Sequence, residues 1–427
     1  MSFTSESRWS DVAVAAVARA ISSCGDFLAA TALLLVLQQR GAGSYAVTAL
    51  LLAAAVPPVV LVRWTGRLAD RVDSRLLLVV TGIGQAVVCV AMVYVSNVYA
   101  LIGLATLLAC GYAQTQPTLA ALLPAMVRDE DLPRASALNQ TAGSIGMLVA
   151  PALGGVLVGL FGLRVPLLFD AVSYLAIVAA GLLIGTRRRG GTAAGPEVTA
   201  SAAVFAPVPA VTWRLRDDRL VWTMVVLFGA LIAAVSAVNV ADVFFVRGVL
   251  HSSTTVYGLL TAAWDGSMLI GAWLLSRRAR SDAAVARMMA GSLLLTCFGV
   301  LAMSAVPNVA VLVPLFVLGG VTNGVENVAA NLTLGRRAPA EFRGRAFATY
   351  GAVANGASAV GFVAGGVVLG VLSVRATVAA SGLFGLAIAL IFMAPLLRAA
   401  ARERSMAGAL PAPVGHPDAG AAIDVPA

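Results

Sequence analysis

Two acidic residues deep inside apolar segments are the side chains of this sequence best suited to chemistry. Asp26 lies midway along one such segment, and Glu326 in another has Asn323 and Asn327 within one helical turn. An unpaired charge in hydrocarbon costs at least about 2.5 kcal/mol, so such acids usually serve a function or form an ion pair. Because desolvation disfavours the ionised form, a carboxyl group there can load a proton or a cationic molecule and release it when its access to water changes. A structural ion pair would give the same pattern.

Three more acids and one arginine lie within apolar segments. Asp170 and Asp242 are near segment ends, where we expect solvated or helix-capping roles, and Asp265 faces either a cavity or a neighbouring helix. Arg19 precedes Asp26 by seven residues, hence on the same helical face, so the two can exchange partners. A mostly apolar pocket with a few polar groups suits amphipathic organic molecules. We expect its lining to include Gln114, Gln116, Asn239, Trp264, Asn323 and Asn327.

Other kinds of chemistry lack support. The sequence has no C-x-x-C spacing and no clustered histidines, so we expect no metal site and no cofactor. It has no G-x-x-x-x-G-K-[ST] loop, which argues against ATP hydrolysis, and no paired histidine or carboxylate motif of a membrane enzyme. We expect no enzymatic activity.

The elements that carry these residues are long apolar runs. Hydrophobic residues make up 60% of the chain and charged residues only 11%. About 20 apolar residues are needed to cross the roughly 30 Å hydrocarbon layer of a lipid bilayer. The sequence predicts an all-α integral membrane protein with transmembrane helices over 11–38, 44–64, 75–95, 98–122, 135–161, 165–186, 219–246, 254–275, 283–304, 308–334, 345–371 and 376–397.

The arginines indicate how these helices are oriented. The chain has no lysine, and in alternate loops it has only Arg40, Arg164, Arg247 and Arg375. All the others except Arg19 lie in the remaining loops and the termini. By the positive-inside rule, both termini are expected in the cytoplasm, with the protein in the cell (inner) membrane. This distribution also explains the net charge of +9 without a nucleic-acid partner.

An internal repeat divides the predicted helices into two sets of six. Arg134-Ala135 and Gly154-Gly155 recur as Arg345-Ala346 and Gly365-Gly366, all offset by 211 residues. We therefore expect two pseudo-symmetric six-helix bundles, 1–186 and 219–398, joined by a cytoplasmic linker, 187–218. Residues 399–427, rich in Ala, Pro and Gly, are expected to form a disordered tail. Such halves usually place a binding site near the midplane between them.

A loop after the second predicted helix carries a family resemblance. Residues 66–75, Gly-Arg-Leu-Ala-Asp-Arg-Val-Asp-Ser-Arg, resemble the loop signature of the Major Facilitator Superfamily, although Asp73-Ser74 replaces the usual Gly-Arg. The D-R-x-D-x-R form, with segments 22–26, 121–124 and 342–345, is similar to the enterobactin-exporter-like and macrolide-efflux-like branch. The resemblance spans roughly residues 8–400 and implies the major facilitator fold.

The resemblance also implies a gating role for this loop. Its residues Gly66, Asp70, Arg71 and Arg75 would form a latch, with Asp70 near Gly344 and Arg345 at the start of the eleventh helix, where the helix dipole favours an anion. A basic loop that only sets orientation is the alternative.

The fifth predicted helix resembles the antiporter motif G-x-x-x-G-P-x-x-G-G of the family. The matching positions are Gly146, Pro151, Gly154 and Gly155, while Ala150 replaces a glycine. Small residues would let helices five and eight approach closely, and the motif accompanies exporters. Ordinary glycine-mediated packing would look the same. The arginine that many proton-driven exporters carry in helix four is missing here.

The resemblance therefore implies a secondary active exporter of a hydrophobic or amphipathic small molecule, such as a drug, a siderophore or a secondary metabolite. We expect alternating access, exchange against protons and a monomer. An importer or uniporter of the same fold, or a receptor or assembly protein that does not transport, remains the alternative.

Overall fold

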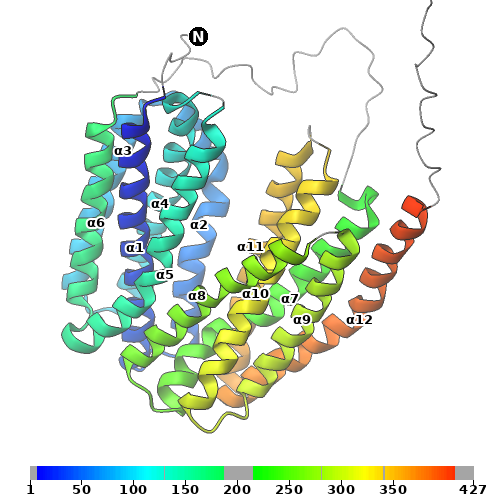
Figure 1. The fold of residues 1–427 in the computed structure, drawn as a ribbon. Helices are drawn as coiled ribbons and strands as arrows, with labels where there is room; N and C mark the ends of the chain where they lie inside the picture. The colour runs from blue at the N-terminus through cyan, green and yellow to red at the C-terminus, as the bar shows by residue number, and fades with distance from the viewer. Residues whose placement is uncertain (1–6, 129, 187–214, 280, 340–341, 409–427) are drawn as a thin grey trace, which may run out of the picture.

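The structure is a computed structural model that describes residues 7–128, 130–186, 215–279, 281–339 and 342–408 (Figure 1). Side chains cap several of its helices close to the predicted starts: the Asp73 carboxylate accepts from the Arg75 and Leu76 amides, and the Asn97 and Asp218 side chains do the same at later helices. The helices are α1 (Trp9–Gln39), α2 (Ser44–Arg71), α3 (Ser74–Tyr94), α4 (Val98–Met126), α5 (Leu132–Phe161), α6 (Arg164–Leu183), the 3-10 turn η1 (Leu215–Asp217), α7 (Arg219–Phe244) with its π-helical extension η2 (Phe245–Val249), α8 (Thr254–Arg278), α9 (Asp282–Met303), α10 (Val309–Arg337), α11 (Arg343–Val371) and α12 (Val374–Gly408).

Twelve helices within the described ranges are long and apolar enough to cross a membrane. The prediction of an all-α membrane protein with twelve spans is therefore confirmed. Two boundaries differ clearly. The helix α2, predicted over 44–64, continues to Arg71 through most of the predicted loop, and α12 continues to Gly408 through residues 399–408 of the predicted disordered tail. Ala and Arg, the commonest residues of 399–408, are strong helix formers. Residues 187–214 of the predicted linker 187–218 and residues 409–427 of the predicted tail lie outside the described residues.

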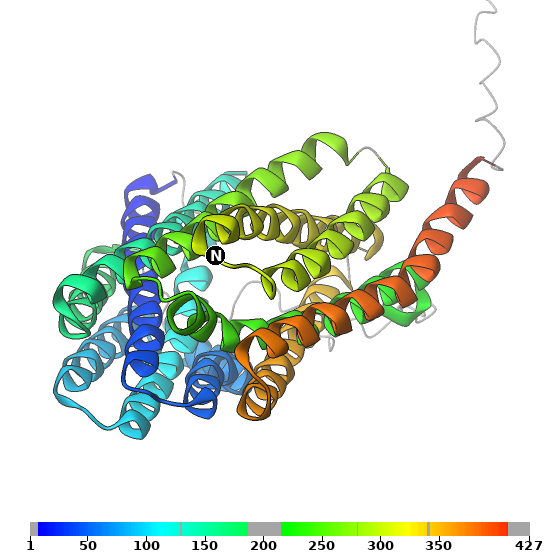
Figure 2. The same cartoon turned by 90° about the horizontal axis from the view of Figure 1, so that it is seen from below.

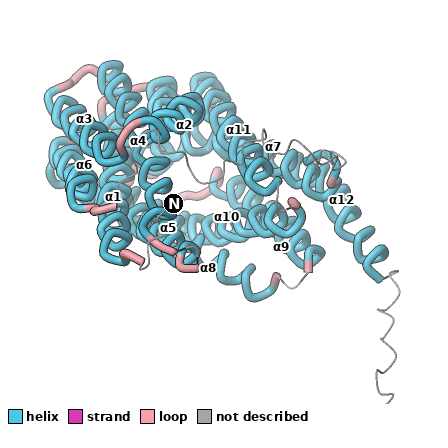
Figure 3. Tube along the Cα trace, turned by 90° about the horizontal axis from the view of Figure 1, so that it is seen from above, coloured by secondary structure: helices cyan, strands magenta, loops and turns pink. Residues whose placement is uncertain are grey.

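The helices pack in two sets of six with the same neighbours in each set (Figures 2 and 3). In the N-terminal half, α1 packs on α5 and α6, α3 on α6, and α2 on α4. In the C-terminal half, α7 packs on α11 and α12, α9 on α12, and α8 on α10. Each contact thus recurs six helices later, as expected for a duplicated unit.

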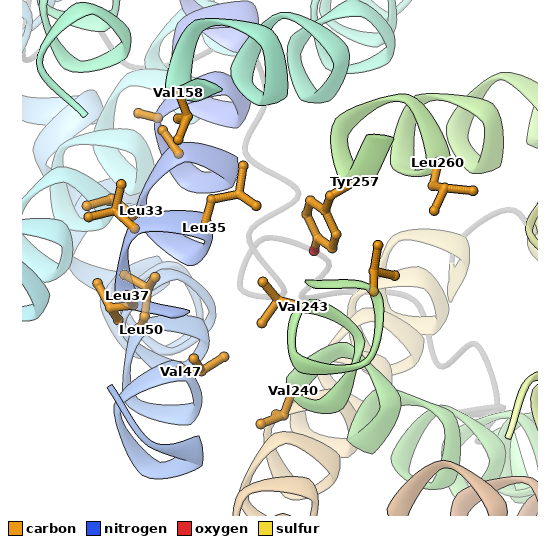
Figure 4. Close-up of a cluster of buried hydrophobic side chains, with 14 of the residues drawn as sticks. Leu33, Leu35, Leu37, Val47, Leu50, Val158, Val240, Val243, Tyr257 and Leu260 are labelled. Carbon is orange, nitrogen blue, oxygen red and sulfur yellow. The ribbon is translucent and has the colours of Figure 1, made fainter. Parts of the chain in front are cut away.

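The two halves join on one side of the molecule and diverge on the other (Figure 1). We call the side on which α1 begins the terminal side. Toward the opposite side, one hydrophobic core includes residues of both halves, among them Leu35, Val47, Val243 and Tyr257 (Figure 4). Toward the terminal side there are two separate cores, one in each half. Burial of apolar area, the main stabilising force of an interface, therefore holds the halves together at the opposite side.

Two glycine contacts bring the halves together there. A Cβ atom on Gly258 of α8 would lie 2.3 Å from the Pro151 carbonyl oxygen of α5 and 3.0 Å from Gly155 Cα. At the second contact, between α2 and α11, the Ser44 hydroxyl donates to the Gly366 carbonyl oxygen at 2.9 Å. A Cβ on Gly366 would lie 2.1 Å from Thr48 Oγ1. Gly155 and Gly366, which share the repeat offset, therefore both let a helix of the other half approach closely.

Candidate functional site

A pocket of about 300 Å³ lies within the C-terminal half. Five residues that the sequence singled out line it: Asn239 of α7, Trp264 of α8, and Asn323, Glu326 and Asn327 of α10. Hydroxyl groups of Ser236, Thr296 and Ser358 add to its polar lining, and the rest is Cys297 with aliphatic and aromatic side chains. Among the described residues, no arginine lines it, so the structure brings these five residues together around one carboxyl group in a wall of mixed polar and apolar groups.

Glu326 is only 5% exposed, and its partners are hydroxyl groups. The Thr296 hydroxyl of α9 donates to Glu326 Oε1 at 2.7 Å, and the Thr296 and Thr322 hydroxyl oxygens are also 2.7 Å apart. Glu326 makes no ion pair with any described residue. The described residues therefore give no support to a structural ion pair at Glu326. A neutral hydroxyl donates to its carboxyl group instead.

The repeat shows that Glu326 stands where the other half has a neutral residue. The offset of 211 residues relates Thr296 to Gln85 and Glu326 to Thr115. In the N-terminal half the Thr115 hydroxyl of α4 donates to Gln85 Oε1 of α3 at 3.3 Å. The equivalent helices α10 and α9 of the other half are joined at the equivalent positions by Glu326 and Thr296. Only the C-terminal half has an acid at this contact.

Neighbouring side chains hold the amides and the indole of the pocket. The Asn327 side-chain amide donates to the Asn323 carbonyl oxygen at 2.9 Å and to Asn323 Oδ1 at 3.0 Å. The Trp264 ring packs edge-on against Phe316, with centroids 6.0 Å apart, and a Cβ on Gly319 would lie 2.1 Å from it. Sequence reasoning missed Thr296, Thr322 and Gly319, since threonines and glycines are common in membrane helices.

Asp26 and Arg19 lie in the other half, away from this pocket. Asp26 Oδ1 accepts a hydrogen bond from the Tyr174 hydroxyl of α6, while Asp26 Oδ2 is buried without a partner. The Arg19 Nε atom is also buried without a partner, close to Gly143 of α5. The two side chains form no ion pair with each other in the structure.

The expectation of a solvated or capping role for Asp170 is wrong. Asp170 is 0% exposed and lies between α1, α3 and α6. It is nearly two turns into α6, and Gly25 lets this part of α6 approach α1 closely, which excludes water. Asp242 is also more enclosed than expected, since its Oδ1 atom is buried without a hydrogen-bond partner.

Three other candidates lie outside the pocket lining. The Gln114 side chain is buried and donates to the Thr65 carbonyl oxygen of α2 at 3.4 Å and to the Thr118 hydroxyl. Gln116 Oε1 is buried without a partner, and Asp265 is half-buried on α8 beside Trp264.

The glycines of the antiporter-like motif in α5 pack on two different helices. Gly146 and Gly154 pack on α1, whereas Gly155 packs on α8.

The contacts of the predicted latch involve side chains outside the described residues, namely those of Asp70 and Arg345. The backbone of the loop is described: α2 includes Gly66 and ends at Arg71, and Asp73 caps α3, in which Arg75 is the second residue. The gating role stays a prediction. Within the described ranges, no three His, Cys, Asp or Glu residues are grouped so that they could hold a metal ion.

Twelve spanning helices in two related halves, with a polar pocket inside an apolar bundle, define a membrane transporter of the major facilitator fold. A family model described as transmembrane secretion effector matches residues 9–415, and the chain belongs to this family of the Major Facilitator Superfamily. Transporters of this kind are not enzymes.

Individual relatives are distant. The chain is 22% identical over 352 residues to the uncharacterized MFS-type transporter YfiS of Bacillus subtilis (strain 168), covering 81% of this chain and 84% of that protein. Among solved structures, the nucleoside transporter NupG has a TM-score of 0.67 at 15% identity, covering 90% of this chain and 98% of that one. A bacterial homologue of the iron transporter ferroportin in an inward-facing state has a TM-score of 0.69 at 14% identity, covering 93% and 100%. These likenesses establish the fold, whereas the predicted enterobactin-exporter-like branch stays a prediction.

Proposed function

We propose that the protein is a proton-coupled exporter of amphipathic small molecules that carry a positive charge. The pocket around Glu326 is the observation that carries this proposal, because a single buried carboxyl group among amides, an indole and aliphatic groups suits an organic cation. The described residues of the lining include no arginine, which argues against an anionic substrate.

Glu326 would serve as the point where proton and substrate exchange. A proton on the carboxyl group removes the charge that attracts the cation, and a bound cation favours loss of the proton. The hydroxyl of Thr296, 2.7 Å away, stabilises the ionised form that binds substrate. Both forms can therefore occur at a site that is almost closed to water.

The direction of transport is inferred from the family description and from a motif. The halves are joined at the side opposite the termini, and the arginine distribution favours cytoplasmic termini, so this conformation would open to the cytoplasm, as importers and exporters both do during alternating access. The description of the family as secretion effectors and the antiporter-like motif in α5 support export. We infer a cell-membrane location, two bundles over 1–186 and 219–398, and a monomer.

The test uses everted membrane vesicles, in which an exporter accumulates substrate from outside. We expect accumulation of cationic amphipathic dyes, less of neutral ones and none of anionic ones, with collapse on addition of a protonophore. Glu326→Gln should abolish accumulation, because the amide neither attracts a cation nor exchanges a proton. Glu130→Gln is the matched control, since Glu130 lies in an exposed loop.

The alternatives give different outcomes. Accumulation in right-side-out vesicles would indicate an importer, and equilibration that a protonophore leaves unchanged would indicate a uniporter. Failure of the purified, reconstituted chain to move any dye would favour a receptor or assembly protein. Normal efflux by Glu326→Gln would remove Glu326 from the mechanism.

A further inference from the structure

A second pair of buried acids lies in the N-terminal half, far along the chain from the Glu326 pocket. The contact between α1 and α6 is unusually close at Gly25, where a Cβ atom would lie 2.2 Å from Ser173 Oγ and 2.4 Å from Asp170 Oδ1. Asp170 therefore reaches the backbone of α1 one residue before Asp26. Only a glycine at position 25 allows this approach.

Neutral donors connect the two carboxyl groups to their surroundings. The Cys89 thiol of α3 donates to Asp170 Oδ2 at 3.2 Å, and the Ser173 hydroxyl lies 3.1 Å from Asp170 Oδ1. The Tyr174 hydroxyl donates to Asp26 Oδ1. Asp170 Oδ2 and Asp26 Oδ1 thus each have a donor, Asp170 Oδ1 shares the Ser173 hydroxyl with the Asp170 carbonyl oxygen 2.8 Å from it, and Asp26 Oδ2 is buried without a donor. A buried oxygen that is charged and unpartnered is costly, whereas an oxygen that carries a proton is not charged.

No ion pair among the described residues compensates the charge of the two acids. Within the described residues, neither Asp26 nor Asp170 makes an ion pair. The other charged or titratable side chains around the pair are Arg19 and Cys24 of α1, Cys89 of α3, Tyr112 of α4 and Tyr174 of α6. On the remaining helices packed nearby, Arg134 lies near the start of α5 at the terminal side, whereas Tyr45 of α2 and Asp242 of α7 lie toward the opposite side. Arg19 lies two helical turns from Asp26, and its Nε atom has no partner.

Asp26 and Asp170 lie at the same contact between α1 and α6 and within electrostatic range of each other, and two such carboxylates in an apolar interior cannot both be ionised without a large electrostatic penalty. We propose that Asp26 and Asp170 bind one proton between them and form a proton site separate from the Glu326 pocket. The proton adds to a carboxylate oxygen of the pair and leaves from it, and no other bond changes. Because the two groups titrate together, the proton belongs to the pair rather than to one residue.

The two acids have different tasks in this site. Asp170 is fully buried, whereas Asp26 is partly exposed as a residue although its Oδ2 atom is buried, so protons would enter and leave at Asp26 when the access of this site to water changes. Tyr112 of α4 lies within electrostatic range of both Asp26 and Arg19 and so belongs to the surroundings through which Asp26 exchanges its proton. Asp170 is therefore a positioning residue, which keeps a proton on the pair while Asp26 exchanges it.

The repeat supports a specialised role for this pair. The offset of 211 residues relates Asp26 to Ala237 and Asp170 to Ser381, so the C-terminal half has no equivalent acids. In turn, the N-terminal half has Thr115 where the other half has Glu326. Each half thus has acids at places where the other half has none. Binding of the proton stands on this geometry alone, and its use in transport rests on the proposed function.

The test is infrared spectroscopy of the purified full-length protein in detergent at neutral pH, without substrate. The carbonyl stretch of protonated carboxyl groups is compared between the wild type and the double variant Asp26→Asn, Asp170→Asn. We expect the double variant to lose the intensity of one protonated carboxyl group. Loss of none, with both acids ionised, or of two, with each acid protonated independently, would overturn the proposal.

Further variants keep the test decisive if the double variant fails to fold. Tyr174→Phe and Cys89→Ala each remove one donor and should shift the frequency of the band without removing its intensity. An unshifted band in both would show that the signal comes from elsewhere and would overturn the assignment. Glu326→Gln is the control in the other half and should leave this band unchanged.

A transport measurement in vesicles distinguishes failure of this inference from failure of the proposed function. If no dye moves in vesicles, the proposed function fails while the infrared result still decides whether the pair holds a proton. If dye efflux occurs, Asp26→Asn should uncouple it from the proton gradient while binding of dye persists. Efflux by Asp26→Asn that still collapses with a protonophore, as in the wild type, would contradict a role of the pair in coupling.

Discussion

The Glu326 carboxyl group illustrates how neutral partners leave an acid available for binding. An arginine beside it would form an ion pair and compete with any cationic ligand. The structure instead provides the Thr296 hydroxyl, which donates to Glu326 Oε1 without neutralising it and itself lies 2.7 Å from the Thr322 hydroxyl. A cation that enters the pocket is then the strongest partner available to Glu326.

This arrangement predicts a measurable role for the Thr296 hydroxyl. Thr296→Val preserves the shape of the side chain but removes the donor to Glu326 Oε1. Since a hydrogen bond to a charged group contributes about 1.5 kcal/mol, we expect the KM for a cationic dye to rise about tenfold. Thr115→Val, which breaks the corresponding contact between Thr115 and Gln85 in the other half, is the control, and its KM should equal that of the wild type. An unchanged KM in Thr296→Val would mean that this bond does not favour the ionised form.

At the scale of helices, glycines determine how closely α8 and α10 pack beside the pocket. A Cβ on Gly271 would lie 1.9 Å from the Val321 carbonyl oxygen, and one on Gly320 would lie 2.2 Å from the Trp264 carbonyl oxygen. A Cβ on Gly324 would lie 2.1 Å from the Met268 carbonyl oxygen. These contacts involve backbone atoms, which cannot move aside separately, so the seam fixes where Trp264 and Glu326 lie relative to each other.

Gly320→Val should therefore separate α8 from α10. We expect a loss of about 2 kcal/mol in the free energy of unfolding, as is typical when a tightly packed core is overfilled. Thermal unfolding in detergent would show this as a midpoint several degrees lower. Gly335→Val on the same helix is the control, because no atom lies within 4 Å of a Cβ there. Equal midpoints for the two variants would contradict a tight seam.

The contact between α2 and α11 offers a second test at this scale. Gly366→Val would place a side chain against Thr48 and weaken the closure at the side opposite the termini. Spin labels on Gln39→Cys and Leu372→Cys, in a background without the native cysteines, should then show a longer component in their distance distribution.

The control for this distance measurement is Gly291→Val on α9. Gly291 is exposed, and a Cβ atom there would have no atom within 4 Å, so its substitution should leave the distances unchanged. Identical distributions in Gly366→Val and the wild type would show that this glycine does not control the closure.

At the scale of the whole molecule, the duplicated fold combines symmetric packing with asymmetric chemistry. The helix contacts of one half recur in the other, and the two glycine seams between the halves are equivalent. The acids do not follow this symmetry, since Asp26 and Asp170 have no counterparts and Glu326 stands opposite a threonine. When the two rigid halves rock about these equivalent contacts, one movement can thus change the access to water of different acids in each half.

The orientation of the whole chain is directly testable. Reporter tags at residues 200 and 410 should both be found in the cytoplasm, and a tag at residue 251 should be found outside, because the positive-inside rule favours the arginine-rich loops in the cytoplasm. Alkaline phosphatase and fluorescent-protein fusions would measure this in intact cells. Tags at 200 and 410 on different sides would rule out an even number of spans between them.

The sequence alone determined the class of this protein and its main division. Runs of about 20 apolar residues must form helices in a bilayer, because no water satisfies the backbone there, so twelve spans could be counted without a structure. The recurrence of residues 134–155 at 345–366 likewise revealed the two halves. The acid Glu326 could be singled out because the cost of burying a charge makes any such residue conspicuous.

Tertiary structure decided which polar groups meet. Helical periodicity places Asn323, Glu326 and Asn327 near one another, but only packing brings Thr296 of α9 and Trp264 of α8 to the same pocket. Asp170 seemed to lie near a solvated helix end, yet the close approach at Gly25 buries it completely and brings it next to Asp26. Such contacts depend on how closely two backbones approach, which is set by the shapes of both helices together and not by either sequence segment alone.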